Sequence, residues 1–182
     1  RHAWTTSARR LQSRGYSVVA YDTRGHGDSD WDPAGRYDVE RLATDLLAVR
    51  DHFSANTPPA VVGASLGGMT ALGAHLLASG ASWAAVILVD VTPRLEFEGA
   101  RRVVTFMAAH PDGFATLDEA AEVIAAYNPH RARPENLDGL HKVLRQRPDG
   151  RWVWRWDPAF VHSNFDFLRD GGYSRDFVEL HL

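Results

Sequence analysis

The chain has 182 residues, of which 45% are hydrophobic and 24% charged, and its formal net charge is −3. This length and composition predict a globular protein of one domain or slightly more, with a buried core. The mildly acidic balance argues against a nucleic-acid binder, because such proteins usually present a basic face to phosphates. Cysteine is absent, which excludes disulfides and thiolate metal sites and fits a reducing compartment.

The first residues of the chain bear on its location and its extent. No apolar run is long enough to span a bilayer, and residues 1–15 lack the apolar core of a signal peptide. We therefore expect a cytoplasmic protein with no membrane partner. The chain opens at Arg1 within a helical pattern that ends at Gly15, so we expect the sequence to be a segment of a longer protein.

Helical and strand patterns alternate over the first half of the chain. The predicted order is helix 1–15, strand 16–22, helix 39–53, strand to Gly63, helix after Ser65 and strand to Asp90. The predicted strands are apolar runs. Alternation of such strands with helices predicts an α/β fold with a parallel sheet covered by helices on both faces.

Beyond residue 95 the pattern changes to helices without buried strands between them. A helix is predicted over 114–127, where Thr116 and Glu119 have the spacing of a capping box. Another helix is predicted over 133–147, before a turn at 148–150. We expect residues 1–94 to form the core and residues 95–182 to form a helical cap, or lid, and a truncated C-terminal segment.

The stretch RWVWRW places tryptophans at alternate positions, at Trp152, Trp154 and Trp156. Because side chains alternate along a strand, this spacing predicts an extended segment with the three rings on one face. An aromatic row of this kind is typical of core packing.

Residues 63–67, Gly-Ala-Ser-Leu-Gly, fit the pattern G-x-S-x-G, a turn that exposes a serine between a strand and a helix. The alternative is an incidental serine in a glycine-rich turn, but the predicted strand and helix stand in the required order. A serine hydroxyl becomes nucleophilic when a neighbouring imidazole takes its proton. We predict that Ser65 is a nucleophile, and we expect Gly67→Val to obstruct the turn sterically.

The glycine-rich loop after Asp22 fits neither a phosphate loop nor a calcium loop, because it lacks the third glycine of the former and the glycine and glutamate of the latter. A structural role remains, in which Gly25 and Gly27 permit a sharp turn. Hydrogen bonds are expected from Asp22, Arg24 and Asp28. His26 is then a structural loop residue and is not expected to be a catalytic base.

The stretches YDTRGHGDSD, VVGASLGGMTAL and VILVDVTPR follow one another as they do in α/β-hydrolases, and the first half of the chain resembles that superfamily. Residues 95–160 resemble the helical cap of such enzymes. The resemblance implies a partial α/β-hydrolase fold, Ser65 as the nucleophile and the backbone N–H of Leu66 as an oxyanion donor. Family members also carry earlier strands and a C-terminal region with the catalytic histidine, and we expect both to be absent here.

The acid and the base of a triad have weaker candidates. Asp90 ends a predicted strand, and His162 and His181 come late enough for the chain order serine, acid, histidine. Neither histidine lies in a glycine-rich loop after a buried strand. We therefore expect the base to lie outside this chain, with His162 and His181 as alternatives.

The predicted function is hydrolysis of a small acyl ester through an acyl-enzyme. Alternatives are a cofactor-free haloperoxidase or perhydrolase that uses the same serine, and a non-catalytic binding protein of this fold. RWVWRW could also face single-stranded nucleic acid or a membrane, although the net charge argues against this. We expect a small-molecule partner, no nucleic acid, no cofactor and no metal; the acyl group, the leaving group and the oligomeric state are left open.

Overall fold

The computed structural model describes residues 1–54, 56–78, 83–92, 97–130, 133 and 135–162. These residues form two compact units. The sheet unit comprises residues 32–101 and His162, and the aromatic unit comprises residues 1–31 and 102–161. Helix α4 (Phe97–Ala108) runs from the first unit into the second.

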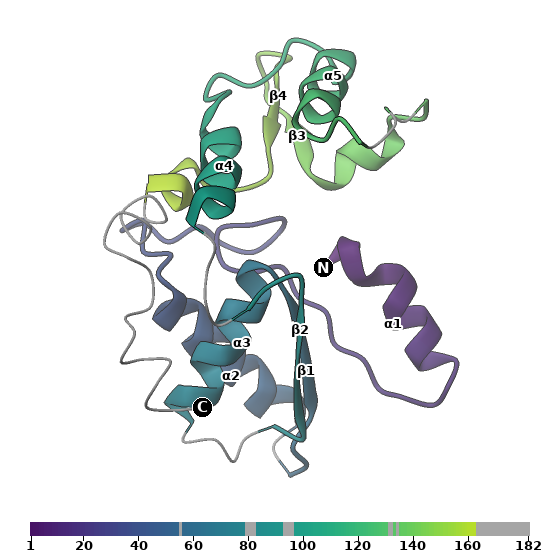
Figure 1. Ribbon diagram of the computed structural model, residues 1–182, viewed down its shortest axis with the longest axis vertical. Coiled ribbons are helices and arrows are strands. Elements are labelled where there is room, and N and C mark those ends of the chain that lie inside the picture. Colours follow the sequence, from purple (N-terminus) through teal and green to yellow (C-terminus); the bar gives the residue numbers. More distant parts are fainter. Residues whose placement is uncertain (55, 79–82, 93–96, 131–132, 134, 163–182) are drawn as a thin grey trace. The chain divides into compact units, whose positions relative to one another are not determined.

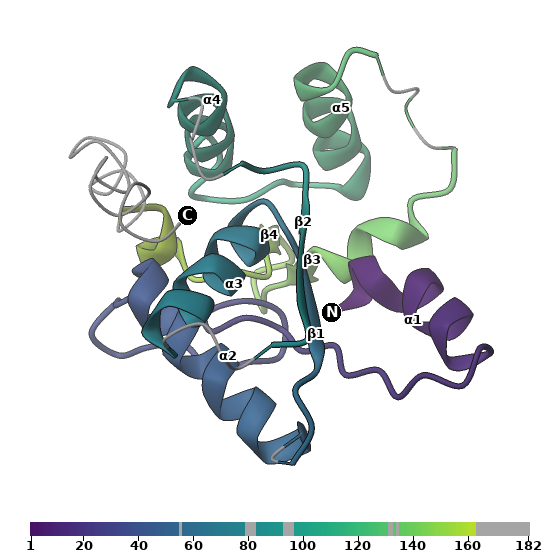
Figure 2. The same cartoon turned by 60° about the horizontal axis from the view of Figure 1, so that its bottom comes forward.

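The sheet unit is built on two parallel strands, β1 (Ala60–Ala64) and β2 (Ala85–Val89). Helices α2 (Val39–Ser54) and α3 (Leu66–Leu77) lie on the same side of the strands (Figures 1 and 2). Helix α3 connects β1 to β2, as a parallel pair requires a crossover. The predicted order of strand, helix and parallel strand is therefore confirmed.

Glycine allows α3 to approach the strands closely. A methyl group at Gly68 would lie 2.4 Å from Cγ1 of Val91, which follows β2. A real side chain does not tolerate so short a contact, so this helix face can only pack here without a side chain. Helix α2 then packs against α3 and buries Leu42 and Ala43 completely.

The other face of the two-stranded sheet carries apolar side chains. Val62, Ile87 and Val89 point to this face and are 41%, 47% and 40% exposed. Within the described part of this unit α2 and α3 cover one face, and coverage of the other face by helices stays a prediction. Apolar strands predict that both faces can be buried, but the pattern does not say which segment covers each.

The N-terminal segment differs in part from its prediction. The helix of residues 1–15 is confirmed as η1 (His2–Trp4) and α1 (Thr5–Gln12), with Gly15 at φ +87° just after it. The strand predicted at 16–22 is wrong, since these residues adopt no strand. A strand needs a neighbour to exchange backbone hydrogen bonds with, and none of the described strands pairs with this segment.

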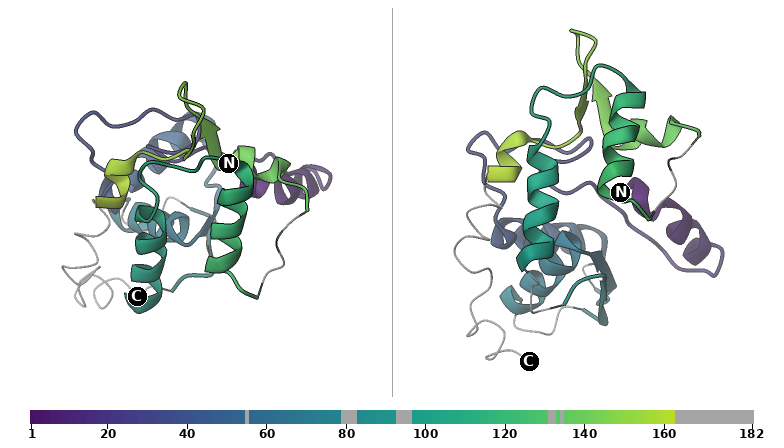
Figure 3. Two further views of the ribbon diagram at one scale, coloured as in Figure 1. Left: turned by 90° about the horizontal axis from the view of Figure 1, so that it is seen from above. Right: turned by 45° about the horizontal axis from the view of Figure 1, so that its top comes forward.

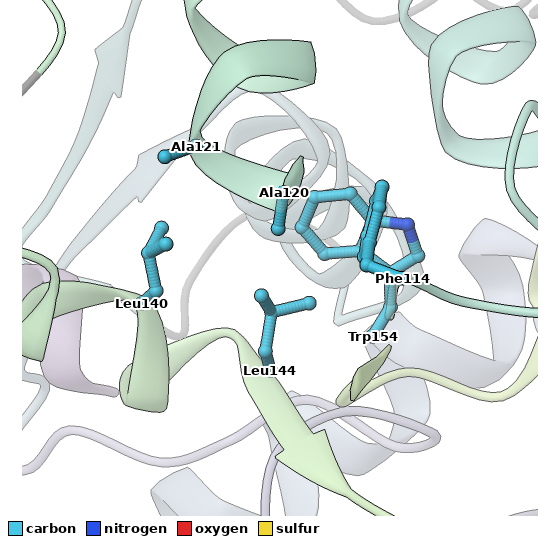
Figure 4. Packing of buried hydrophobic residues seen from close by; sticks show 6 residues of the cluster. All are labelled: Phe114, Ala120, Ala121, Leu140, Leu144 and Trp154. Carbon is cyan, nitrogen blue, oxygen red and sulfur yellow. The ribbon is translucent and has the colours of Figure 1, made fainter. Parts of the chain in front are cut away.

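The aromatic unit is organised around an antiparallel hairpin of β3 (Leu144–Gln146) and β4 (Trp152–Trp154). Phe114 pairs with Trp152 on the free side of β4 through backbone hydrogen bonds of 2.7 and 2.8 Å. Helix α5 (Leu117–Tyr127) and the short helix η2 (Asp138–Lys142) pack on the hairpin. Figure 4 shows the resulting cluster, with Phe114 and Trp154 beside the alanines of α5.

Helix α5 begins with the predicted capping box. Oγ1 of Thr116 accepts the backbone N–H of Glu119 at 3.1 Å, and Oε2 of Glu119 accepts the N–H of Ala115 at 2.6 Å. These bonds satisfy N–H groups at the helix start that have no partner within the helix.

The helix predicted over 133–147 is wrong, because η2 and β3 occupy most of this range. Leu140 and Leu144 are buried, as the apolar spacing suggested, but Leu144 belongs to a strand opposite Trp154. Long-range pairing with β4 outweighs the local helical spacing. The predicted turn is confirmed, with Gly150 at φ +83° between the two strands.

The predicted extended tryptophan segment is confirmed by β4. The rings of Trp154 and Trp156 stack with centroids 4.5 Å apart, and Trp154 meets Phe114 edge-on at 5.4 Å and Phe106 of α4 at 5.8 Å. Trp154 is 8% exposed. This packing accounts for the aromatic row of RWVWRW as part of a core.

Candidate active site

Ser65 lies between β1 and α3, where it is the N-cap residue of the helix. Its φ of 48° and ψ of −118° form a conformation that costs a non-glycine residue about 1–3 kcal/mol. Backbone hydrogen bonds hold it there: its N–H donates to the carbonyl oxygen of Val89 at 3.1 Å, and its own carbonyl accepts from Gly68 and Met69 at 2.9 and 3.1 Å. The side chain of this strained residue is exposed.

Two glycines make this turn possible. A methyl group at Gly63 would lie 2.2 Å from the carbonyl oxygen of Gly67, and the clash at Gly68 is nearly as close. Gly67 itself has nothing within 4 Å of such a methyl group. A Cβ at Gly67 therefore meets no obstruction, and the effect of the larger Gly67→Val stays a prediction. The turn needs the small size of Gly63 and Gly68, because these two meet backbone and a packed side chain.

The start of α3 offers hydrogen-bond donors beside Ser65. The first N–H groups of a helix cannot bond within it, and Leu66 is the first residue of α3. The helix dipole adds a partial positive charge at this end. Oγ1 of Thr70 donates to the carbonyl oxygen of Leu66 at 2.9 Å, which helps to fix the first turn. The N–H of Leu66 can therefore stabilise negative charge that develops next to Ser65.

Asp90 follows β2 as Ser65 follows β1. Since Ala64 lies opposite Val89, the next residues of the two strands are neighbours at the same edge of the sheet. Asp90 has a φ of 53°, and Ser65 and Asp90 are the described non-glycine residues with positive φ. Strained residues of this kind cluster at functional sites. The sequence suggested Asp90 only as a strand end and gave no sign of its strain.

The histidine candidates are less well placed. His162 is exposed and lies in a helical stretch that begins at residue 158, where Oδ1 of Asp157 accepts the N–H of Ala159 at 2.9 Å. His181 lies outside the described residues. The identity of the base therefore stays a prediction.

The loop after Asp22 has the structural role that was predicted for it. Gly25 and Gly27 have φ of 73° and 58°, and a methyl group at Gly27 would lie 2.5 Å from the carboxylate of Asp22. The N–H of Asp28 donates to that carboxylate at 3.2 Å. The sequence did not predict that this loop is bonded to the segment after β4. The backbone N–H of Gly27 donates to the carbonyl oxygen of Arg155 at 2.7 Å.

His26 is part of this loop and packs inside the aromatic unit. Its ring meets that of Phe160 edge-on at 4.6 Å, and Nδ1 lies 3.1 Å from the carbonyl oxygen of Arg24. Burial lowers the pKa of His26 from its ordinary value, because the protonated ring loses solvation. These contacts support the structural role predicted for His26.

Two other kinds of site were sought in the part of the chain that the structure describes. Within it, no group of three or more His, Asp and Glu side chains is arranged to hold a metal ion. None of the helices in the same residues is both long enough and apolar enough to cross a membrane.

Comparison with known proteins adds to this geometry. The sequence profile of the serine aminopeptidase S33 family matches residues 2–113. The chain belongs to this family of α/β-hydrolases. Its turn at Ser65, its parallel strands and its crossover helix are elements of that fold.

Relatives with known names include an esterase and an enol-lactonase. Esterase Rv0045c of Mycobacterium tuberculosis is 30% identical over 174 residues, which are 93% of this chain and 57% of that protein. A solved structure of that esterase matches 91% of this chain and 58% of its own, with a TM-score of 0.67 and 28% identity. The 3-oxoadipate enol-lactonase 2 of Acinetobacter baylyi is 46% identical over 56 residues, 30% of this chain and 20% of that enzyme. The chain thus spans just over half the length of the esterase.

Proposed function

We propose that the protein is an ester hydrolase in which Ser65 is the nucleophile and forms an acyl-enzyme. The observation that carries this proposal is the strained, exposed Ser65 at the junction of β1 and α3. Such a turn keeps Oγ accessible and directs the helix N-terminus toward the same point.

In the proposed reaction, Oγ of Ser65 attacks the ester carbonyl carbon while a histidine base takes the hydroxyl proton. The N–H of Leu66 donates to the oxyanion of the tetrahedral intermediate. The intermediate collapses to the acyl-enzyme, and the leaving alcohol receives the proton from the histidine. A water molecule, deprotonated by the same base, then releases the carboxylic acid and restores the serine.

We assign the acid of this triad to Asp90. It stands next to Ser65 at the carboxyl edge of the sheet, on a strained backbone that neighbouring structure must hold. A carboxylate in this role orients the histidine and stabilises its protonated form. Asp90→Asn keeps the shape and removes the charge, so it should lower kcat strongly while leaving Ser65 in place.

The names of the relatives support an ester as the substrate, since an esterase and an enol-lactonase both act on ester bonds. We further propose that the aromatic unit acts as the cap of the enzyme, that the substrate is a small molecule and that the protein is cytoplasmic. Nothing described favours a haloperoxidase or a nucleic-acid partner over this proposal.

A fluorophosphonate probe tests the proposal, because it modifies only an activated serine. In the intact protein, peptide mass spectrometry should find the label on Ser65 and p-nitrophenyl esters should be hydrolysed. Ser54→Ala is a matched control, since Oγ of Ser54 donates to the carbonyl oxygen of Thr57 at 3.0 Å and is only structural.

The outcomes separate the alternatives. Labelling of Ser65 without ester hydrolysis, but with peroxide-dependent oxidation, would favour the perhydrolase. A folded protein whose Ser65 stays unlabelled would instead be a binding protein of this fold.

A further inference from the structure

The surface of the aromatic unit carries an open cavity of about 380 Å³, and four of the five described residues that line it are exposed. Its volume lies in the range of small-molecule sites, which is roughly 300–1,000 Å³. The lining residues are Arg102, Tyr127, Asn128, Pro129 and His130. No part of the proposed reaction at Ser65 uses these residues.

Packed elements hold the walls of this cavity. Figure 3 shows α4 and α5 side by side, and the ring of Phe106 in α4 stacks on that of Tyr127 in α5 with centroids 4.2 Å apart. The backbone N–H of Asn128 donates to the carbonyl oxygens of Ile124 and Ala125 at 3.2 and 3.1 Å, which closes the end of α5. Tyr127 and Asn128 therefore project from fixed backbone at the end of α5.

The polar lining consists of hydrogen-bond donors. A guanidinium, a phenol, a carboxamide and an imidazole can all donate, and the described lining residues include no carboxylate. Arg102 makes no ion pair with any described residue, whereas its neighbour Arg101 pairs with Glu98 at 3.0 Å. Arg133, Arg147 and Arg155 of the aromatic unit pair with carboxylates, whereas Arg9, Arg10 and Arg145 form no ion pair with a described residue. Arg102 is the arginine among the described lining residues, so it presents to the cavity a positive charge that no described carboxylate compensates.

We propose that this cavity binds the carboxylate of a small organic acid. Arg102 forms the charge-assisted hydrogen bonds, for which its planar fork matches a carboxylate. Tyr127 and Asn128 donate further bonds to the same ligand.

The end of α5 selects between anions. A helix C-terminus carries a partial negative charge of about half an elementary charge, which weakens the binding of any anion there. The carbonyl oxygens of Ile124 and Ala125 are already occupied by Asn128, which reduces this effect. A dianionic phosphate suffers more from the helix end than a singly charged carboxylate, and a single arginine compensates it less well. The ligand is therefore a carboxylate.

A carboxylate ligand has two possible sources. It is either a free acid that another reaction supplies or the acid that ester hydrolysis releases. The second source rests on the proposed function, whereas binding of a free acid does not. The experiment therefore measures binding in a protein that cannot turn over an ester.

Binding is measured by titrating the intact protein carrying Ser65→Ala with glutarate in a calorimeter. Saturable binding is expected, and Arg102→Gln should weaken it by about 10-fold or more, since it removes a charged hydrogen-bond donor. Arg101→Gln removes the same charge one residue away and should change the affinity by less than about 2-fold, because Arg101 pairs with Glu98 and is not among the residues that line the cavity. Absence of saturable binding, or an equal loss in the two arginine variants, overturns the proposal.

Tyr127→Phe is a smaller change that tests the same cavity if Arg102→Gln does not fold. Tyr127→Phe keeps the stack on Phe106 and removes only the hydroxyl, so it should weaken glutarate binding by about 5-fold with an unchanged unfolding midpoint. Unchanged affinity in both Tyr127→Phe and a folded Arg102→Gln contradicts the assignment.

Kinetics then identify the source. If the carboxylate is the released acid, the protein with Ser65 intact should hydrolyse monomethyl glutarate at least as well as methyl valerate, and the glutarate that it forms should bind with the affinity measured by calorimetry. If another reaction supplies the acid, monomethyl glutarate should be a poor substrate compared with methyl valerate, while glutarate still binds. A protein that binds glutarate but hydrolyses neither ester would refute the proposed function and leave the carboxylate site standing.

Discussion

In the sheet unit, backbone hydrogen bonds and bare glycine backbone hold Ser65 in a strained conformation, and few side chains take part. In the aromatic unit, large rings from α4, β4 and the segment around Phe114 support one another, while regular secondary structure is short. The first unit thus relies on neighbours in sequence and on one adjacent strand. The second relies on residues that lie tens of positions apart, so changes in the two units should show in different measurements.

The largest effect is expected in the sheet unit and on activity alone. In the intact protein, Ser65→Ala should lower kcat for an ester by about 10⁴ or more, because nucleophile and base act as one unit. The exposed side chain contributes little to packing, so the unfolding midpoint should hardly change. An enzyme that retains most of its activity on p-nitrophenyl esters would remove Ser65 from the mechanism.

In the aromatic unit the corresponding variant should affect stability. Trp154→Ala removes a ring that stacks on Trp156 and meets two phenylalanines, and should cost about 3–5 kcal/mol in the free energy of unfolding. Unfolding in urea measures this loss in the free energy of unfolding.

A second tryptophan provides the comparison for Trp154. Trp31 is 42% exposed and its ring lies 5.7 Å below the guanidinium of Arg145. Trp31→Ala should therefore cost about 1 kcal/mol at most. Equal losses in the two variants would contradict the view of Trp154 as the centre of this unit.

A pair of glycine variants sharpens the description of the sheet unit. Gly63→Ala puts a methyl group against the carbonyl oxygen of Gly67 and should cost about 1–3 kcal/mol, together with loss of fluorophosphonate labelling of Ser65. Gly67→Ala meets open space and should leave stability unchanged or raise it by up to about 1 kcal/mol, since alanine favours a helix. If Gly67→Ala lowered the stability more than Gly63→Ala, contacts other than those of Gly63 would hold the turn.

The smallest effect concerns the pH dependence of the aromatic unit. Burial lowers the pKa of His26 in the folded state from its ordinary 6.5, so the unfolded state binds more protons in acid. The contribution of His26 to stability is therefore complete above pH 6.5 and is lost as the pH falls through the folded-state pKa. His26→Phe keeps the packing on Phe160 and should flatten the dependence of unfolding on pH below this range. If the free energy of unfolding of His26→Phe depended on pH as steeply as that of the unchanged protein, another titrating group would cause the pH dependence.

Much of the candidate site could be predicted because it is local in sequence. Ser65, the strand before it and the helix after it fall within eighteen consecutive residues, from Ala60 to Leu77. Hydrophobic period and glycine spacing report directly on such a segment. The capping box of α5 was predictable for the same reason, since Thr116 and Glu119 are three positions apart.

The tertiary structure alone decided the rest, because distant partners determine it. Residues 16–22 have the composition of a strand but no described neighbour to pair with, and residues 133–147 have helical spacing but pair in part with β4. The register of β1 and β2 brings Asp90 next to Ser65, and the stack of Phe106 on Tyr127 joins α4 to α5, where Arg102 meets the end of α5. A sequence pattern records which faces are apolar, whereas hydrogen bonds and close packing between remote segments select which faces meet.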